Sequence, residues 1–479
     1  MSPTLAERPH ILLIISDDHG YADLSSRGSA DARTPHLDRL AASGMSFDSA
    51  YVTAPICSPS RAGLIAGAHQ QRWGGHWFSD ASFPPEQQPV LPELLGEGGY
   101  RTGYFGKVHY GFEQPGDRAC PERHGFDSSF YGMTSTSAGR LHYLHHSRAS
   151  RERLGDEFHA VHGVNPMFEN GRETDCERHL TSEFAQRAID FMGPAPEAAA
   201  DGAPAEDPFF CMVAFNAVHN FAWQLPEDEL AVRALPSHDD FDPDTDKYID
   251  WYDGAISPHL ENGRGYYLAQ LEIMDREIGR MLDHLEATGR REHTLVVYLT
   301  DNGGSACNYG INAPLHGTKY SLFEGGVRVP LMVSWPGRIQ PGSRSDVLIS
   351  SMDLLPTFLA AAGLRPPRPE QIDGRPLQDC WEGDGTGHEL LHFDTGFQWA
   401  VRDREWKLRW VDEEDTTYRD RLLRNEHTDI GAGLTLVPIG TDLDESPQAD
   451  VADQHPEVVA ALLEAHRDWS ARMRSHASA

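Results

Sequence analysis

The sequence predicts an α/β protein with a large, mixed and mostly parallel sheet sandwiched by helices, and a smaller C-terminal α+β subdomain. Continuous apolar runs, typical of strands buried on both faces of a parallel sheet, occur at 11–16, 208–215 and 294–300. Apolar residues at helical spacing from Gly265 to Thr288 predict a covering helix. Beyond about residue 385, short alternating runs predict an antiparallel sheet, followed by a helix from Pro456. We therefore expect two domains, at 1–384 and 385–479.

The hydrophobic content and the net charge of the chain limit which kinds of partner it can bind. The chain has 479 residues, 39% of them hydrophobic, and no apolar run of transmembrane length. Residues 1–10 show no charged-then-apolar signal region, so we expect a cytoplasmic protein without a membrane partner. A net charge of −32 argues against nucleic acid and requires a local group of cations to bind an anionic substrate. The six cysteines show no paired spacing and are expected to be reduced.

Oxygen-bearing side chains follow two of the predicted buried strands. Asp17 and Asp18 end the first strand, and Asp301 and Asn302 end the strand at 294–300. The carboxyl ends of parallel strands share one edge of a sheet, where ligands bind. These oxygens suit a hard divalent cation, and the number of carboxylates favours Ca²⁺ over Mg²⁺. A solvated acidic turn is the alternative for Asp17 and Asp18.

Basic residues follow two further strands. Lys107 and His109, two apart on an extended chain, can face one pocket together, and His219 follows the strand at 208–215. Lysine is rare, with only Lys107, Lys247, Lys319 and Lys407 in the chain, so a lysine can mark a position that requires a compact ammonium.

The stretch Cys57-Ser-Pro-Ser-Arg61 precedes a predicted helix at 61–68, with Ser60 as its N-cap. A helix start favours anions. We expect Cys57 there to be a thiol of low pKa, with Arg61 as a fixed cation. A buried structural cysteine is the alternative interpretation.

This stretch resembles the C-x-P-x-R signature of type I sulfatases, which belong to the alkaline-phosphatase-like superfamily. Further matches follow in the family's order over nearly the whole chain: Asp17-Asp18, Gly106-Lys107-x-His109, His219, Asp301-Asn302-Gly303, Lys319 ahead of Glu324-Gly-Gly-Val-Arg-Val-Pro330, and Val401-Arg402-Asp403-x-x-Trp406-Lys407-Leu408. The sequence departs from the family pattern after His219, where the proline-rich stretch is missing, and at His316, where many members carry arginine.

The resemblance implies a sulfuric ester hydrolase in which a separate formylglycine-generating enzyme oxidises Cys57 to formylglycine, whose hydrate is the nucleophile. It implies metal ligation by Asp17, Asp18, Cys57, Asp301 and Asn302. Arg61, Lys107 and Lys319 would spread the charge on the sulfate oxygens. His219, with Lys319, would protonate the leaving alcohol. Asp301 would assist deprotonation of the attacking hydroxyl, and His109 would take the proton of the second hydroxyl.

The substrate is expected to be a small-molecule or oligosaccharide sulfate ester, either aryl, alkyl or carbohydrate. Trp73, Trp77, Trp223 and His316 are candidate contacts, with ordinary packing as the alternative for Trp73 and Trp77. Residues 113–180 are expected to form long loops over the site; 193–207 and 237–253 are expected to be surface loops. Two other functions stay open: a phosphonate monoester or phosphodiester hydrolase with the same site, and a catalytically inactive binder of sulfated ligands.

Overall fold

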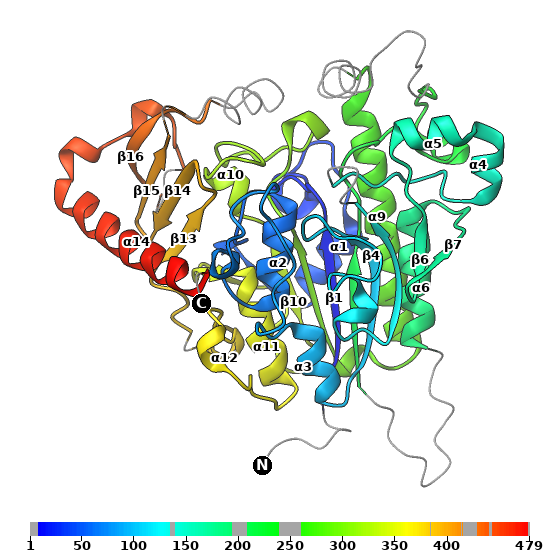
Figure 1. Cartoon of the computed structure of the whole chain (residues 1–479), viewed down its shortest axis with the longest axis horizontal. Coiled ribbons are helices and arrows are strands. Elements are labelled where there is room, and N and C mark those ends of the chain that lie inside the picture. Colours follow the sequence, from blue (N-terminus) through cyan, green and yellow to red (C-terminus); the bar gives the residue numbers. More distant parts are fainter. Residues whose placement is uncertain are drawn as a thin grey trace.

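A computed structural model describes residues 8–134, 139–193, 208–238, 260–383, 385–412, 414, 429–439 and 443–477. Its centre is a large sheet, seen in the middle of Figure 1. This sheet has ten strands in the order β11-β2-β10-β9-β1-β8-β4-β5-β6-β7. In that order the strands are β11 (Ser343–Ser345), β2 (Met45–Phe47), β10 (Leu331–Ser334), β9 (Thr294–Thr300), β1 (His10–Ser16), β8 (Phe209–Ala214), β4 (Arg101–Val108), β5 (Ser128–Met133), β6 (Met167–Glu169) and β7 (Arg172–Thr174).

The five central strands, β9, β1, β8, β4 and β5, are mutually parallel, which brings their carboxyl ends to one edge of the sheet. β10 runs antiparallel to β9, and β6 runs antiparallel to β5. The mostly parallel sheet predicted from the apolar runs is therefore confirmed. In β1, Leu12 and Ile14 face one core cluster, whereas Ile11, Leu13 and Ile15 face the other.

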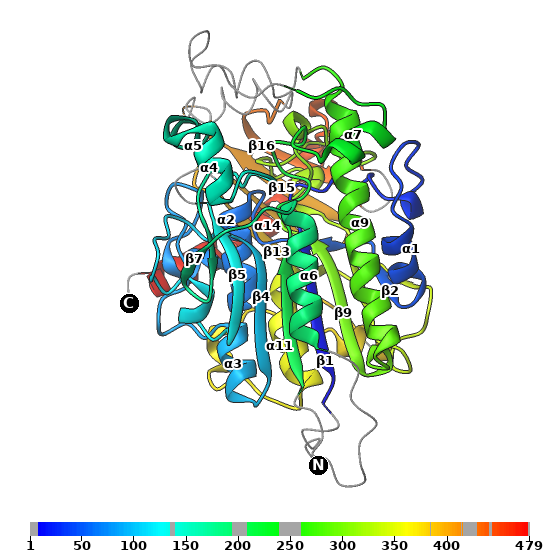
Figure 2. The same ribbon diagram turned by 90° about the vertical axis from the view of Figure 1, so that its right-hand side faces the viewer.

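Helices cover both faces of the sheet. One face is covered by α1 (Pro35–Ala42), α6 (Leu180–Met192) and α9 (Gly263–Ala287), and Figure 2 shows α6 and α9 side by side. The other face is covered by α2 (Cys57–Ala66), α3 (Leu91–Glu97) and α11 (Leu354–Ala361). Shorter elements complete this part: β3 (Ala50–Tyr51), α4 (Arg148–Leu154), α5 (Asp156–His162), α7 (Glu227–Val232), α10 (Glu324–Val327), β12 (Ile349–Ser350) and α12 (Gln378–Glu382).

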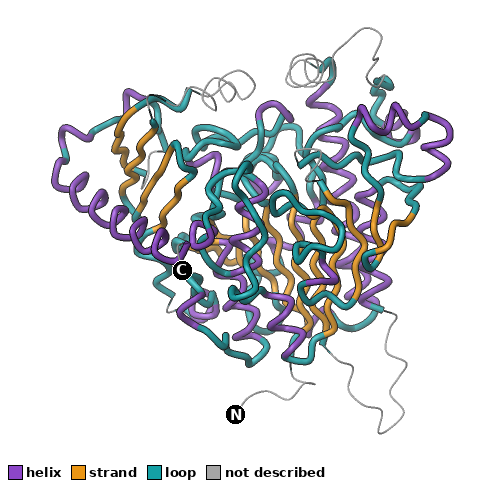
Figure 3. Tube along the Cα trace, viewed as in Figure 1, coloured by secondary structure: helices purple, strands orange, loops and turns teal. Residues whose placement is uncertain are grey.

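The C-terminal part holds a separate four-stranded antiparallel sheet, which lies beside the large sheet in Figure 3. Its strands are β13 (Leu391–Asp394), β14 (Gln398–Arg402), β15 (Trp406–Val411) and β16 (Gly433–Pro438). The last helix, α14 (Pro456–Ala477), packs on this sheet through Leu462, His466 and Trp469, and also contacts the segment 70–73. The expected antiparallel sheet and terminal helix of the C-terminal part are thus observed.

Two local expectations are wrong. α2 begins at Cys57 and not at Arg61, and the Ser60 hydroxyl donates to the Asp301 carbonyl at 2.5 Å instead of capping the helix. The span 113–180 is not only loop, because it contains β5, which pairs with β4 in the large sheet. Of the expected surface loops at 193–207 and 237–253, residues 194–207 and 239–253 lie outside the described residues.

Among the described residues, no helix combines the length and apolarity needed to cross a membrane. All six cysteines are free, and Cys211 lies in the buried strand β8.

Candidate active site

The predicted site residues lie where four neighbouring strands end. In the order β9, β1, β8 and β4, these strands contribute Asp301 and Asn302, then Asp17 and Asp18, then His219, then Lys107 and His109. Backbone hydrogen bonds hold the ends together, because the Asp301 N–H donates to Ser16 at 3.1 Å and the Asp17 N–H donates to Ala217 at 2.8 Å. Residues nearly 300 positions apart in sequence are therefore neighbours.

Asp17 lies between two buried cations. Its Oδ2 atom accepts a hydrogen bond from Arg61 Nη2 at 3.1 Å and also contacts the Lys107 ammonium. Burial raises the pKa of this carboxyl, but Lys107 and Arg61 together outweigh burial and hold the pKa below its ordinary value. Asp17 is therefore a carboxylate at neutral pH.

Asp18 is surrounded by donors. Its Oδ1 atom lies 2.7 Å from both Lys319 Nζ and Asn302 Nδ2. Its Oδ2 atom accepts from Asn308 Nδ2 at 2.7 Å and lies 3.6 Å from His219 Nε2. Burial raises the pKa of Asp18; the Lys319 ammonium opposes this rise, and the Asp17 charge adds to it.

Asp301 completes a balanced set of buried charges. Its Oδ2 atom accepts from Arg61 Nε at 2.7 Å, so the Arg61 guanidinium bridges Asp301 and Asp17. Burial raises the pKa of Asp301 to about 6, with a further rise from Asp17 and an opposing effect from Arg61. Each member of the set is at most 3% exposed; three are carboxylates and three are cations: Asp17, Asp18, Asp301, Arg61, Lys107 and Lys319.

Cys57 lies in the first turn of α2 and points into this set. Its Sγ atom is 3.2 Å from Lys319 Nζ and 3.5 Å from Asp17 Oδ1. The expected low pKa is wrong: burial raises the thiol pKa well above its ordinary value, and Asp17 and Asp301 raise it further. The residue is 2% exposed and carries a neutral thiol, which is a poor nucleophile.

Two histidines line the same space. His109 and His219 are each 7% exposed. Burial lowers the pKa of both rings well below the ordinary value, and Lys107 and Lys319 lower it further. Both rings are therefore neutral at neutral pH. A bound anion would raise these pKa values, because it would offset the neighbouring cations.

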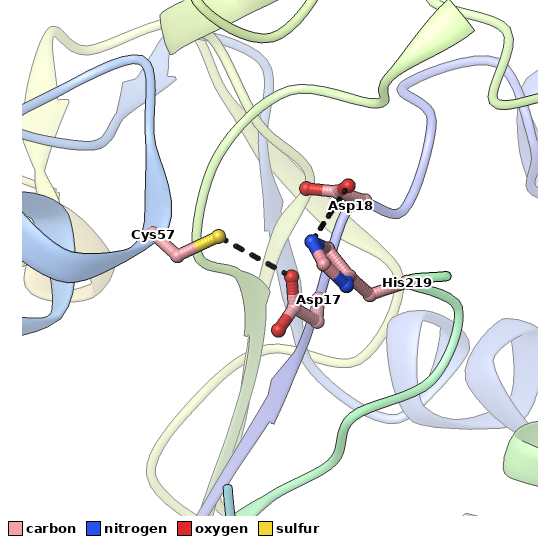
Figure 4. A group of neighbouring side chains, drawn as sticks. All are labelled: Asp17, Asp18, Cys57 and His219. Carbon is pink, nitrogen blue, oxygen red and sulfur yellow. Dashed lines mark hydrogen bonds and ion pairs between the residues drawn. The ribbon is translucent and has the colours of Figure 1, made fainter. Parts of the chain in front are cut away.

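The residues present fit a hard divalent cation. The ligand atoms of Asp17, Asp18, Cys57 and His219 all lie within 4.8 Å of one another (Figure 4). Asn302 Oδ1 is buried and accepts no hydrogen bond from any described residue, as a metal-facing acceptor would. Carboxylate and amide oxygens are suitable ligands for Ca²⁺ or Mg²⁺. His219 was not predicted among the ligands, whereas the Asp301 carboxylate is engaged by Arg61.

The four candidate substrate contacts lie in different surroundings. Trp77 is 3% exposed and packs edge-on against Phe397 at 5.0 Å between ring centroids. Trp223 is also buried, and it lies 5.5 Å from the Phe221 ring. Trp73 is half-buried and donates to the Ser82 carbonyl at 3.1 Å. His316 is half-buried against Phe323. Packing accounts for Trp77 and Trp223, whereas Trp73 and His316 are partly exposed.

Sequence reasoning missed Asn308. Its Oδ1 atom accepts from Asn220 Nδ2 at 2.8 Å, which orients its Nδ2 atom toward Asp18. Asn220 directly follows His219. The two asparagine side chains therefore link the loop that carries His219 to the Asp18 carboxylate. No spacing rule singles out an asparagine in a loop, although its short distance from Asp301-Asn302 in sequence was an available signal.

A mostly parallel sheet, with an oxygen-rich cluster and buried cations at its carboxyl edge, is the arrangement of a hydrolase of the alkaline-phosphatase-like class. The sequence profile of the Sulfatase family matches residues 9–364, so the chain belongs to the sulfatase family.

Two curated relatives show how similar the chain is to named members of this family. The chain is 33% identical to N-acetylgalactosamine-6-sulfatase of Canis lupus familiaris over 77% of its own length and 65% of the relative's length. It is 28% identical to the steryl-sulfatase of Mus musculus over 97% of its own length and 82% of the relative's length.

Solved structures share the whole fold. Ps i-CgsB in complex with k-i-k-neocarrahexaose is 25% identical, with a TM-score of 0.76 over 97% of this chain and 93% of that one. The phosphonate monoester hydrolase of Agrobacterium radiobacter is 20% identical, with a TM-score of 0.62 over 98% and 96%, and its likeness shows the fold alone.

Proposed function

We propose that the protein hydrolyses a sulfate ester, with a formylglycine at position 57 and one divalent cation. The observation that carries this proposal is the position of Cys57, whose sulfur lies between the Asp17 carboxylate and the Lys319 ammonium. An unmodified thiol of raised pKa is a poor nucleophile, so this central position is better explained by a modified side chain.

The proposed cation is Ca²⁺, with Mg²⁺ as the alternative, and it would be held by Asp17, Asp18, Asp301, Asn302 and residue 57. Three buried carboxylates and a free amide oxygen support the larger, less hydrated ion. When bound, the cation would supply Lewis-acid stabilisation of negative charge. The formylglycine would supply a hydrated aldehyde as the nucleophile, and a formylglycine-generating enzyme is the partner required to form it.

The cations of the site would bind the sulfate group. Lys107, Arg61 and Lys319 offer fixed N–H donors in a buried site, where electrostatic stabilisation of developing charge is strongest. A divalent cation would leave the balanced set with a net positive charge. The site would then attract an anionic ester despite the chain's net charge of −32.

The two neutral histidines suit proton transfer. His219 Nε2 would give a proton to the leaving alcohol, assisted by Lys319, once the bound sulfate has raised the histidine pKa. His109 would take a proton from the second hydroxyl of the hydrate after the alcohol has left; the bond between residue 57 and the sulfate would then break, releasing sulfate and restoring the aldehyde. Asp301, whose pKa is raised to about 6 by burial, would assist deprotonation of the attacking hydroxyl.

The proposed substrate is a small-molecule or oligosaccharide sulfate ester. The names of the relatives include both an amino-sugar sulfatase and a steryl-sulfatase. The complex of Ps i-CgsB with k-i-k-neocarrahexaose favours a carbohydrate. Trp73 and His316 are the proposed contacts for such a ring, because both are partly exposed.

Turnover measurements on three ester classes test the proposal. We expect 4-nitrophenyl sulfate to be hydrolysed with a higher kcat/KM than a phosphonate monoester or a phosphodiester, and a Cys57→Ala variant to be inactive on all three. Higher turnover of either phosphorus ester would favour the phosphonate or phosphodiester hydrolase. Binding of a sulfated sugar without turnover, in protein whose position 57 is modified, would favour an inactive binder.

A further inference from the structure

A second cluster of buried charges lies between the large sheet and the C-terminal sheet. We call it the Glu324 cluster; its members are Tyr51, Glu324, Arg328, Arg402, Lys407 and Glu445. They come from β3, α10, β14, β15 and the segment before Pro447. Glu324 and Lys407 are 0% exposed. The roles proposed above do not use this cluster, although it includes two stretches that match the sulfatase pattern.

Glu324 is its centre. The Oε2 atom accepts from the Tyr51 hydroxyl at 2.5 Å and lies 3.3 Å from Nη1 of both Arg328 and Arg402. The Oε1 atom pairs with Lys407 Nζ at 3.0 Å. Burial raises the pKa of this carboxyl, but the surrounding cations, led by Lys407, reverse the effect and hold the pKa far below its ordinary value. Glu324 is therefore ionised.

Lys407 connects this carboxylate to a second one. Its Nζ atom also lies 3.0 Å from Glu445 Oε1, and Glu445 Oε2 accepts the Glu324 backbone N–H at 2.5 Å. The start of α10 is thus held through both its side chain and its backbone. Lys407 lies on β15, in the middle of the C-terminal sheet, so that sheet fixes the start of α10.

The backbone around α10 holds the catalytic segment in turn. The Gly325 N–H donates to His316 at 2.8 Å, and the Lys319 N–H donates to Gly304 at 3.1 Å. The Gly303 N–H, next to Asn302, donates to Gly326 at 3.0 Å. The loop at Gly303 and the start of α10 are in close contact, because a Cβ atom at Gly303 would lie 1.8 Å from the Gly325 carbonyl oxygen. A shift of α10 would therefore move Lys319 relative to Cys57.

We propose that Glu324 is a positioning residue for Lys319, and that Lys407 holds Glu324 in place from the C-terminal sheet. The inference rests on the proposed function, in which Lys319 acts on the sulfate ester. Buried ion pairs contribute little net stability compared with apolar packing, but they fix geometry, because a displaced charge loses its partners. Such a cluster is suited to hold the segment that carries Lys319, because the Lys319 ammonium must stay within hydrogen-bond distance of Asp18 and Cys57.

A double-mutant cycle tests the inference. Glu324→Gln keeps the side-chain shape and removes its charge; we expect kcat on 4-nitrophenyl sulfate to fall about tenfold or more, as for a small misplacement of a catalytic group. In a Lys319→Ala background, the same change is expected to have almost no effect on kcat, because its target is already removed. The control is Asp275→Asn, a buried carboxylate on α9 that accepts the His36 and Leu37 backbone N–H groups at the start of α1. Its effect should be small and equal in both backgrounds.

A second readout does not depend on activity. Limited acylation followed by mass spectrometry should show faster labelling of Lys319 in Glu324→Gln than in wild type, with Lys107 on β4 unchanged as the internal control. If Glu324→Gln fails to fold, Lys407→Arg replaces it in both experiments, with a smaller effect expected in the same direction. Unchanged Lys319 labelling, or an equal loss of kcat in both backgrounds, would overturn the inference. Absence of wild-type turnover would overturn the proposed function instead, and the labelling result would still decide the positioning role.

Discussion

Replacing Lys319 by arginine separates charge from shape at the proposed site. Lys319 Nζ contacts three atoms, at 2.7 and 3.0 Å on Asp18 and at 3.2 Å on Cys57. Burial lowers the pKa of this ammonium, but Asp18 outweighs burial and raises the pKa well above its ordinary value. The variant keeps the positive charge, but a guanidinium is planar, larger and unable to give up a proton near neutral pH.

The magnitude follows from the packing. Lys319 is 3% exposed, so the extra atoms must displace neighbours, at a cost of about 1–3 kcal/mol. If all of that strain is lost from transition-state stabilisation, kcat falls about 5- to 150-fold, at one factor of ten per ~1.4 kcal/mol. The assay is turnover of an activated aryl sulfate and of an alkyl or sugar sulfate. The loss should be larger on the second substrate, because a more basic leaving alcohol needs a proton donor.

The matched control is the exposed Arg344→Lys, whose side chain is 62% exposed and pairs with Asp48 on the surface. It should leave kcat unchanged, because exposed pairs contribute little. Near-wild-type rates for Lys319→Arg on both substrates would show that only charge is required. Equal losses on both substrates would remove the proton-donor role and leave Lys319 as an electrostatic clamp.

Three further predictions concern the modification, the metal and pH. Fully active enzyme should carry formylglycine at position 57, and an intact-thiol mass for that peptide in active protein would contradict this. Chelation should abolish turnover, and Ca²⁺ should restore it. Asn302→Ala removes a proposed ligand, so in a metal titration it should weaken metal affinity by at least the ~10- to 100-fold that is typical for losing an outer-shell partner. Unchanged affinity would exclude Asn302 as a ligand. Burial lowers the pKa of His69 to about 4. Between pH 6.5 and 4 the unfolded state therefore binds more protons than the folded state. The free energy of unfolding should fall on acidification through this window, by up to about 1.4 kcal/mol per pH unit. His69→Phe should make the melting temperature less dependent on pH between 7 and 5; an unchanged slope would refute the assignment.

The fold class could be predicted because its signals are local. The runs that became β1, β8 and β9 are apolar at nearly every position, as burial on both faces requires. β5 was missed because its apolar residues, Phe130, Tyr131 and Met133, are preceded by two serines and interrupted by a glycine. Its strand state comes from pairing with β4, which is a long-range contact.

The same difference between local signals and long-range contacts explains which features of the site could be predicted. Its strand-end residues could be named because a parallel sheet brings such ends together, and the structure does bring them together. The start of α2 was misplaced because the Ser60 hydroxyl finds the Asp301 carbonyl, a partner some 240 residues away. The low thiol pKa was wrong for a related reason: a helix start favours a thiolate, but burial beside two carboxylates outweighs it. The catalytic roles and the cytoplasmic location stay predictions.

The burial of Cys57 limits when a maturing enzyme can modify it. In the folded protein the residue is 2% exposed and closed in by Lys319, so a maturing enzyme could reach it only before these parts meet. Lys319 follows Arg61 by roughly 260 residues, which corresponds to about 10–50 s of synthesis at typical translation rates. Under the proposed function, the modified fraction would depend on whether oxidation is completed within this interval. Slower translation, or a larger supply of the maturing enzyme, should therefore raise the specific activity of the purified protein without any change in its sequence.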